Sequence, residues 1–166
     1  MNRVPAALAA AGAAGLLSAG LLAQTAVQGT RTAAYHSPMV VETSFSLTTP
    51  SQWDADRWQA GADHGELSVY RCDDIVITEF GMKVHRLKEG RVRVRLRATL
   101  DNRGGRDREV SMRAELLKNG TVVAGAEDEV EVEEGDDSGW GVGFQTTEEI
   151  LTSTPPPRLR LTVNVD

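Results

Sequence analysis

The chain has 166 residues, 40% of them hydrophobic, and a formal net charge of −6 at pH 7. This length and hydrophobic content suit one folded domain with a single core. The negative net charge excludes general nucleic-acid binding, which needs a basic surface, and the single cysteine, Cys72, excludes an intrachain disulfide.

The first 29 residues predict export from the cytoplasm. Arg3 precedes an apolar run from Val4 to Ala23, and small residues follow that run. Its few strongly apolar residues favour membrane insertion by only about 3 kcal/mol, which is marginal for a permanent span. We therefore expect residues 1–29 to be a cleaved signal peptide or an uncleaved membrane anchor, with a buried helix as the third reading. No cysteine follows the run, which excludes a lipoprotein.

Residues 30–65 predict a linker that contains one short helix. The first part is rich in Ser and Thr and lacks helical periodicity, although residues 39–45 suit a strand. Farther along, Ser51 and Asp54 resemble a capping box, and a glycine suited to the position after a helix follows. The pattern therefore predicts a helix near residues 52–60.

Trp53 and Trp58 lie within this predicted helix. Five residues along a helix correspond to a rotation of about 140°, so the two rings cannot share one narrow stripe. We expect one tryptophan to pack on the domain and the other to be half exposed. The alternative is an aromatic platform for a protein partner or a glycan.

Residues 66–166 predict an antiparallel immunoglobulin-like β-sandwich of about seven strands. Short alternating segments are separated by turn sequences, and none of them has a helical period. Asn119 and Gly120 form the strongest type of hairpin dipeptide, and Gly81 marks a bulge or bend inside a long strand. The sequence therefore predicts an all-β fold, preceded by the signal or anchor segment and the short helix.

A strand, a loop with Asn and Gly, a second strand and a turn ending in glycine follow one another over residues 94–125, VRLRATLDNRGGRDREVSMRAELLKNGTVVAG. This order resembles the centre of the FxLYD-like and related exported sandwich domains. The matching positions are Asn102 with Gly104 or Gly105 in the loop, and Leu116 and Gly120 in the second strand and its turn. The departures are Ala114 where the signature aromatic stands, Leu117 in place of Tyr and Lys118 in place of Asp. The resemblance implies an accessory or adhesive module outside the membrane.

Residues 91–100, RVRVRLRATL, alternate arginine with apolar residues. Because successive side chains of a strand point to opposite faces, the apolar face must be the core face. The opposite face then carries a row of four exposed arginines, namely Arg91, Arg93, Arg95 and Arg97.

The acidic segment EDEVEVEE, residues 127–134, alternates in the same way. We expect it to pair beside the arginine strand, with Arg93 and Arg95 near Glu129, Glu131 or Glu133. Exposed cross-strand ion pairs of this kind contribute about 0.2–1 kcal/mol each and would favour this strand register. The alternative is that the arginines bind an external anionic partner.

The sequence carries no recognisable catalytic constellation. Three histidines are present, with neither a GxSxG motif nor a phosphate-binding glycine loop. A cluster of acidic residues and one histidine fits no calcium or zinc ligand spacing, so we expect a solvated loop rather than a tight metal site, with a weak divalent site as the alternative. Its members are Asp54, Asp56, Asp63, His64 and Glu66. Cys72 is expected to be a small buried residue rather than a reactive thiol.

These observations predict an exported, non-enzymatic sandwich module without a cofactor, which engages a protein partner in an envelope or extracellular assembly. Its location would be periplasmic or extracellular, with membrane contact only through residues 4–23 if they are retained. The alternatives are a carbohydrate or envelope-polymer binder and, more remotely, a metal-dependent hydrolase. The candidate partner-binding residues are Trp53, Trp58, Arg93, Arg95 and Arg97.

Overall fold

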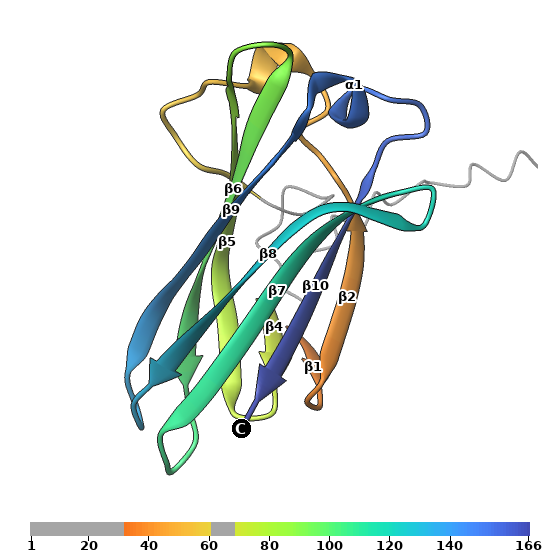
Figure 1. The fold of residues 1–166 in the computed structure, drawn as a ribbon. Helices are drawn as coiled ribbons and strands as arrows, with labels where there is room; N and C mark the ends of the chain where they lie inside the picture. The colour runs from red at the N-terminus through yellow and green to blue at the C-terminus, as the bar shows by residue number, and fades with distance from the viewer. Residues whose placement is uncertain (1–31, 61–68) are drawn as a thin grey trace, which may run out of the picture.

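The computed structural model describes residues 32–60 and 69–166, which form an all-β sandwich (Figure 1). The expected export segment 1–29 lies outside the described residues. The strands are β1 (Thr32–Tyr35), β2 (Met39–Ser44), β3 (Gln59–Ala60), β4 (Val69–Cys72), β5 (Ile75–Arg86), β6 (Arg91–Asn102), β7 (Arg108–Lys118), β8 (Thr121–Val132), β9 (Asp137–Thr147) and β10 (Arg158–Val165). The helical elements are a 3-10 turn, η1 (Pro50–Gln52), and a short helix, α1 (Glu148–Leu151). Among the described residues, no helix is long and apolar enough to cross a membrane.

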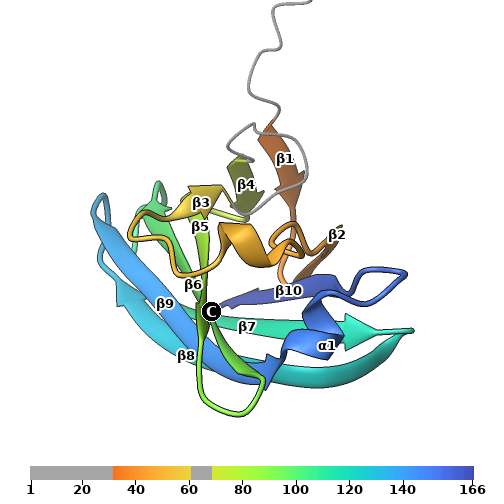
Figure 2. The same ribbon diagram turned by 90° about the horizontal axis from the view of Figure 1, so that it is seen from above.

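The strands form two sheets that face each other (Figure 2). The first sheet has the order β1-β4-β5-β6-β9, with β3 added to β5, and the second has the order β2-β10-β7-β8. Within residues 32–60 and 69–166, β1 and β4 pair in parallel and the other strand pairs are antiparallel. At one side of the sandwich, β8 and β9 lie next to each other where the two sheets meet.

The chain crosses between the sheets in the manner of an immunoglobulin-like sandwich. It passes from the first sheet to the second between β6 and β7, and again between β9 and β10. The strands before the two crossings, β6 and β9, are neighbours, and so are the strands after them, β7 and β10. This interlocked arrangement is that of strands B, E, C and F in immunoglobulin domains, so the predicted fold class is confirmed.

Alternating apolar residues of the two sheets form the core between them. On β6, the apolar residues from Val92 to Leu100 are at most 4% exposed, and the same core contains Met112 and Leu116 of β7. Trp140 of β9 is among the largest fully buried side chains. The alternation of residues 91–100 therefore predicted the buried face correctly.

Two predicted turn features are also confirmed. Asn119 and Gly120 form the two-residue turn between β7 and β8. A turn of this kind needs positive φ at both positions, and the two residues have φ of 52° and 79°. In β5, the register with β6 shifts between Thr78 and Gly81, and Glu79 has φ of 52°. This irregularity is the bulge or bend that the glycine in the strand indicated.

Within the predicted linker, the strand that residues 39–45 suited is confirmed as β2, but the linker character of this segment and the predicted helix are wrong. β2 pairs with β10 over six residues, and Phe45 and Leu47 after it are each 2% exposed, so the segment from Met39 onward belongs to the sandwich. In place of a helix near 52–60, one 3-10 turn is followed by turn and bend residues and then by β3. Trp53 provides the physical reason: its indole is 5% exposed and donates a hydrogen bond to the Leu47 carbonyl at 2.9 Å. To bury its ring, Trp53 takes extended dihedral angles, with φ of −81° and ψ of 165°, and this ends the 3-10 turn.

Cys72 is fully buried, and burial raises the pKa of its thiol to about 11. At pH 8 only about one molecule in a thousand then carries the thiolate, which is the reactive form. We expect a thiol reagent such as dithiobisnitrobenzoate to leave the folded protein essentially unmodified over an hour at pH 8 and to modify one thiol at once in urea. Rapid modification of the folded protein would contradict this burial.

Candidate binding site on the arginine-bearing sheet face

The predicted pairing of the arginine strand with the acidic strand is wrong. β6 lies between β5 and β9, so Arg95 stands across from Lys83 on one side and Gly143 on the other. The acidic strand is β8, which pairs with β7 in the other sheet. The tight Asn119–Gly120 turn is the cause, because it keeps β8 beside β7, and β9 takes the place beside β6. Arg93 likewise stands across from His85 and Gln145, away from Glu129, Glu131 and Glu133.

Charge pairing does occur, but it involves other arginines, on the outer face of the second sheet. Arg113 binds Glu127 at 2.6 Å, and this hydrogen bond raises the pKa of Arg113. Arg160 lies between two carboxylates, at 2.7 Å from Glu42 and 3.6 Å from Glu115. On this face, therefore, both of these arginines are matched by acids of the same molecule.

The outer face of the first sheet differs in this respect. Its arginine face, which we define as Arg91, Arg93, Arg95 and Arg97 of β6, is exposed along its whole length. Within residues 32–60 and 69–166, none of these four guanidinium groups forms an ion pair. The side chain across from Arg95 on β5 is that of Lys83, which adds to the positive charge. Like charges directly opposite each other are unfavourable in a sheet.

A row of glycines lies beside the arginine face. Gly139, Gly141 and Gly143 alternate along β9, so all three point outward, and the last two stand across from Arg97 and Arg95. Because no side chain covers the backbone there, the surface is hollowed. Glycine inside a strand commonly marks a place where a ligand or another backbone approaches closely.

Two adjoining hollows result. One, of about 360 Å³, is lined by Trp58, Arg95, Arg97, Gly141 and Gly143. The other, of about 630 Å³, is lined by Arg93, Arg95, Gly143 and Gln145. They share Arg95 and Gly143, so together they form one open trough along β6 and β9, with arginines as one wall.

Trp58 closes one end of the trough and holds its basic side chains. Its half-buried ring has the Arg97 guanidinium at 4.8 Å, the Lys83 ammonium at 5.1 Å and the Arg95 guanidinium at 6.0 Å from its centre. Such contacts are worth about 0.5–1 kcal/mol each at exposed sites. β3 positions this residue by pairing with β5, and Gly81 leaves room for it, since a Cβ there would lie 3.3 Å from the Cβ of Trp58.

The two tryptophans thus have different roles, as the sequence predicted: one packs on the domain and the other is half exposed. Trp53 is a core residue with Arg86 at 5.1 Å over its ring, so it offers no surface to a partner. Arg86 in turn donates its backbone N–H to Asp54 at 2.7 Å, and this bond lowers the pKa of Asp54. Sequence reasoning found the arginines and Trp58 but missed the glycine row, although the alternation GWGVG already places those glycines on one face.

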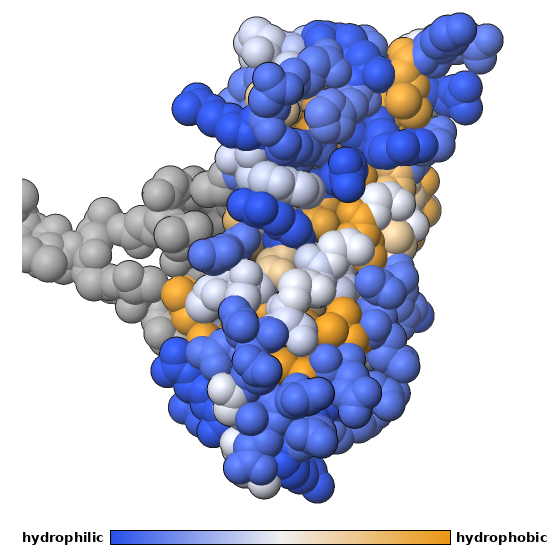
Figure 3. All heavy atoms as spheres, turned by 90° about the vertical axis from the view of Figure 1, so that its left-hand side faces the viewer, coloured by the Kyte–Doolittle hydropathy of each residue, from blue (hydrophilic) through white to orange (hydrophobic). Residues whose placement is uncertain are grey.

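Figure 3 shows the side of the molecule that lies on the left in Figure 1. This side is mostly hydrophilic, and its apolar residues form small, separate patches. A partner that binds on this side would therefore be recognised mainly through polar and charged groups.

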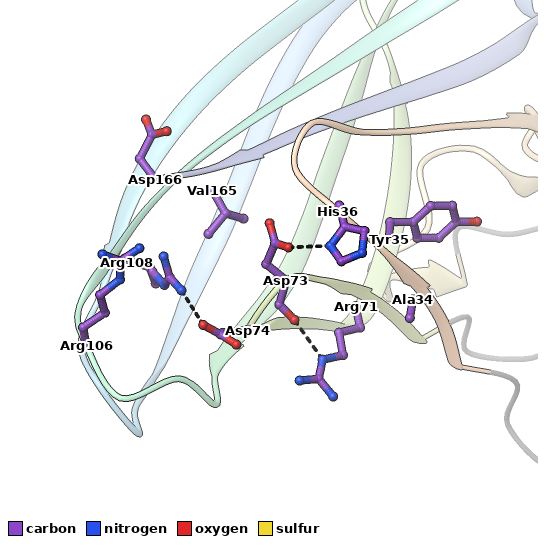
Figure 4. A pocket seen from close by; sticks show the side chains of 10 residues that line it. All are labelled: Ala34, Tyr35, His36, Arg71, Asp73, Asp74, Arg106, Arg108, Val165 and Asp166. Atoms are coloured by element: carbon purple, nitrogen blue, oxygen red, sulfur yellow. Dashed lines mark hydrogen bonds and ion pairs between the residues drawn. The ribbon is translucent and has the colours of Figure 1, made fainter.

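Another hollow, of about 680 Å³, lies at the turn between β4 and β5 (Figure 4). Both aspartates at its turn are paired internally: Arg108 binds Asp74, and Asp73 contacts His36 at 3.0 Å. The hydrogen bond from His36 is the main cause that lowers the pKa of Asp73. The Arg71 Nε also donates to the Asp73 carbonyl at 2.8 Å. These internal pairs leave less unmatched charge for a ligand than the arginine face has.

The acidic cluster near Trp53 is only partly described. Asp54 is engaged by Arg86, and Asp63, His64 and Glu66 lie outside the described residues. In the part of the chain that the structure describes, no group of three or more His, Cys, Asp or Glu residues is placed to hold a metal ion.

The chain matches no family model and no curated protein sequence. Among solved structures it is similar to a β-glucuronidase from glycoside hydrolase family 2, at 11% identity and a TM-score of 0.38, over 52% of this chain and 8% of that one. It is also similar to the Avr2 effector protein from the fungal plant pathogen Fusarium oxysporum, at 7% identity and a TM-score of 0.33, over 78% of this chain and 88% of that one. Similarity at this level carries no information about function.

Proposed function

We propose that this protein is an exported, non-enzymatic binding module, whose arginine face and trough bind an acidic, extended segment of a protein partner. The observation that supports this most is the contrast between the two sheets. The arginines of the second sheet, Arg113 and Arg160, each bind a carboxylate of the same chain. Those of the arginine face have no acidic partner among the described residues. An external anion would neutralise them.

The spacing of the arginines supports an extended peptide as the ligand. Alternate residues of a strand are about 6.6 Å apart, so successive guanidinium groups leave β6 at that interval. A peptide in the extended conformation with an acid at every second position presents carboxylates at the same interval. Each arginine can then meet one carboxylate, and the glycines of β9 let the peptide backbone approach the sheet.

The carbohydrate alternative has less support. Sugar binding by stacking needs exposed aromatic rings, but Trp53 is buried and the ring of Trp58 is already contacted by Arg97 and Lys83. Export rests on the apolar segment 1–29, and the resemblance of residues 94–125 to exported sandwich domains agrees with an accessory role. The net charge of −6 opposes nucleic acid as the ligand.

The test is a titration of the full chain against a fluorescent seven-residue peptide that alternates Glu and Thr, measured by anisotropy at 20 mM salt. We expect R93Q/R95Q to weaken binding at least tenfold, because it removes two of the four cations. The matched variant R103Q/R106Q removes the same charge from exposed arginines of the β6–β7 loop and should change affinity less than twofold. Added salt should weaken binding, since exposed charges are screened.

A second pair of variants tests the trough without changing charge. Gly143→Val fills it, because a Cβ there lies 3.4 Å from the Val94 carbonyl and 3.6 Å from the Arg95 side chain. Gly139→Val is the control, since a Cβ there meets nothing within 4 Å. Only the first should weaken peptide binding. Equal binding by wild type and R93Q/R95Q would refute the proposal, and tighter binding of polygalacturonate than of the peptide would favour the carbohydrate alternative.

A further inference from the structure

A second surface of unmatched charge lies on the outer face of the second sheet. We define the acidic patch as Glu109 of β7 together with Glu129 and Glu131 of β8. All three are exposed, and none of them forms an ion pair with any described residue. Glu131 stands directly across from Glu109 in the sheet, and the charge of Glu129 raises the pKa of Glu109.

The acidic patch and the arginine face share the same unfavourable feature with opposite signs. In the acidic patch, Glu131 faces Glu109; on the arginine face, Arg95 faces Lys83. Cross-strand neighbours of like charge destabilise a sheet, and neighbours of opposite charge stabilise it. Farther along the same two strands, Arg113 and Glu127 form such a favourable pair. Within one molecule, the sheet order keeps β6 and β8 in different sheets, so the two surfaces cannot neutralise each other.

We propose that the acidic segment bound by the arginine face is the acidic patch of a second copy of this chain, so that copies associate head to tail. This inference rests on the proposed function and names its partner. Glu129 and Glu131 are two residues apart on a strand, as are Arg93 and Arg95, so the carboxylates and guanidinium groups have the same spacing of about 6.6 Å. Two different surfaces meet at such an interface. Each copy that joins therefore leaves one arginine face and one acidic patch free, and association continues beyond the dimer.

The test is sedimentation velocity of the full chain between 5 and 200 µM, at 20 mM and 500 mM sodium chloride. For wild type, we expect the mean mass to rise with concentration at 20 mM salt and to fall to that of the monomer at 500 mM. R93E/R95E lacks one surface and E129K/E131K lacks the other, so each alone should be monomeric. A 1:1 mixture of the neutral variants R93Q/R95Q and E129Q/E131Q has one intact interface and should form dimers without larger species.

Circular dichroism spectra and unfolding midpoints of both variants establish that they fold, and R93Q/R95Q and E129Q/E131Q provide milder versions of each change. Monomeric wild type at 200 µM and 20 mM salt would overturn the inference, and so would association of E129K/E131K as strong as that of wild type.

The alternating Glu–Thr peptide separates the two proposals, because E129K/E131K keeps its arginine face. Peptide binding by this variant, without association of wild type, refutes only the self-association. If neither wild type nor E129K/E131K binds the peptide, the proposed function is refuted.

Discussion

Replacing Trp53 by alanine is expected to lower the free energy of unfolding by about 3–5 kcal/mol, the range for large aromatic residues removed from a core. Trp53 is 5% exposed, donates a hydrogen bond to the Leu47 carbonyl and packs under Arg86. The alanine variant loses the buried ring and leaves that carbonyl without its donor. Urea denaturation followed by circular dichroism measures the change.

Two further variants make this result specific. Trp53→Phe keeps most of the apolar contact but not the hydrogen bond, so we expect a smaller loss of about 1–3 kcal/mol. Trp58→Ala removes a half-buried ring together with its three cation–π contacts, so it should cost at most about 1.5–3 kcal/mol, less than Trp53→Ala, while it weakens binding of the acidic peptide by loosening Arg97. Equal destabilisation by Trp53→Ala and Trp58→Ala would contradict the different burial of the two rings.

Asn102→Ala should also be strongly destabilising, by about 2–4 kcal/mol, since unpaired buried polar groups cost about 1–3 kcal/mol each. Asn102 is fully buried, and its amide donates to the carbonyls of Arg106 at 2.8 Å and Val132 at 2.9 Å. Its side-chain oxygen accepts from the Gly104 backbone at 2.9 Å. One side chain thereby fixes the loop between β6 and β7 and joins it to the end of β8.

Thermal and urea unfolding of Asn102→Ala would measure this effect, with Asn164→Ala as the control. Asn164 is half-buried on the outer face of β10, and its removal should change stability by less than about 0.5 kcal/mol. Asn102→Asp keeps the acceptor but replaces the donor by a buried carboxylate, so it should be at least as harmful as alanine. A neutral effect of Asn102→Ala would mean that water replaces these bonds.

Local features of the fold could be predicted from the sequence because they depend on neighbouring residues. The alternation of residues 91–100 determines which face of β6 is buried, and the Asn119–Gly120 dipeptide determines the turn between β7 and β8. Each of these signals lies within a dozen residues of the chain and needs no knowledge of distant segments.

Strand neighbours were not predictable in the same way, because they depend on contacts between distant segments. Two segments, β8 and β9, both alternate and both could lie beside β6. The charge of the two segments favoured β8, since its glutamates would form exposed ion pairs with the arginines of β6. In the structure, β9 occupies this position and buries Trp140 and Phe144. Exposed pairs contribute at most about 1 kcal/mol, less than about 1.5–3 kcal/mol for burying one large apolar side chain. The candidate site exists because β9, and not β8, lies beside β6. This places glycines rather than glutamates next to the arginines.

The pairing of β2 with β10 has a consequence for the timing of folding. Glu42 and Arg160, which bind each other across this pair, are 118 residues apart in the chain. At a synthesis rate of about 5–20 residues per second, β2 leaves the ribosome roughly 6–24 s before its neighbour exists. Contacts between such distant segments also slow folding after the chain is made. In a nascent chain with this strand order, the second sheet therefore stays incomplete until the last strand has been made.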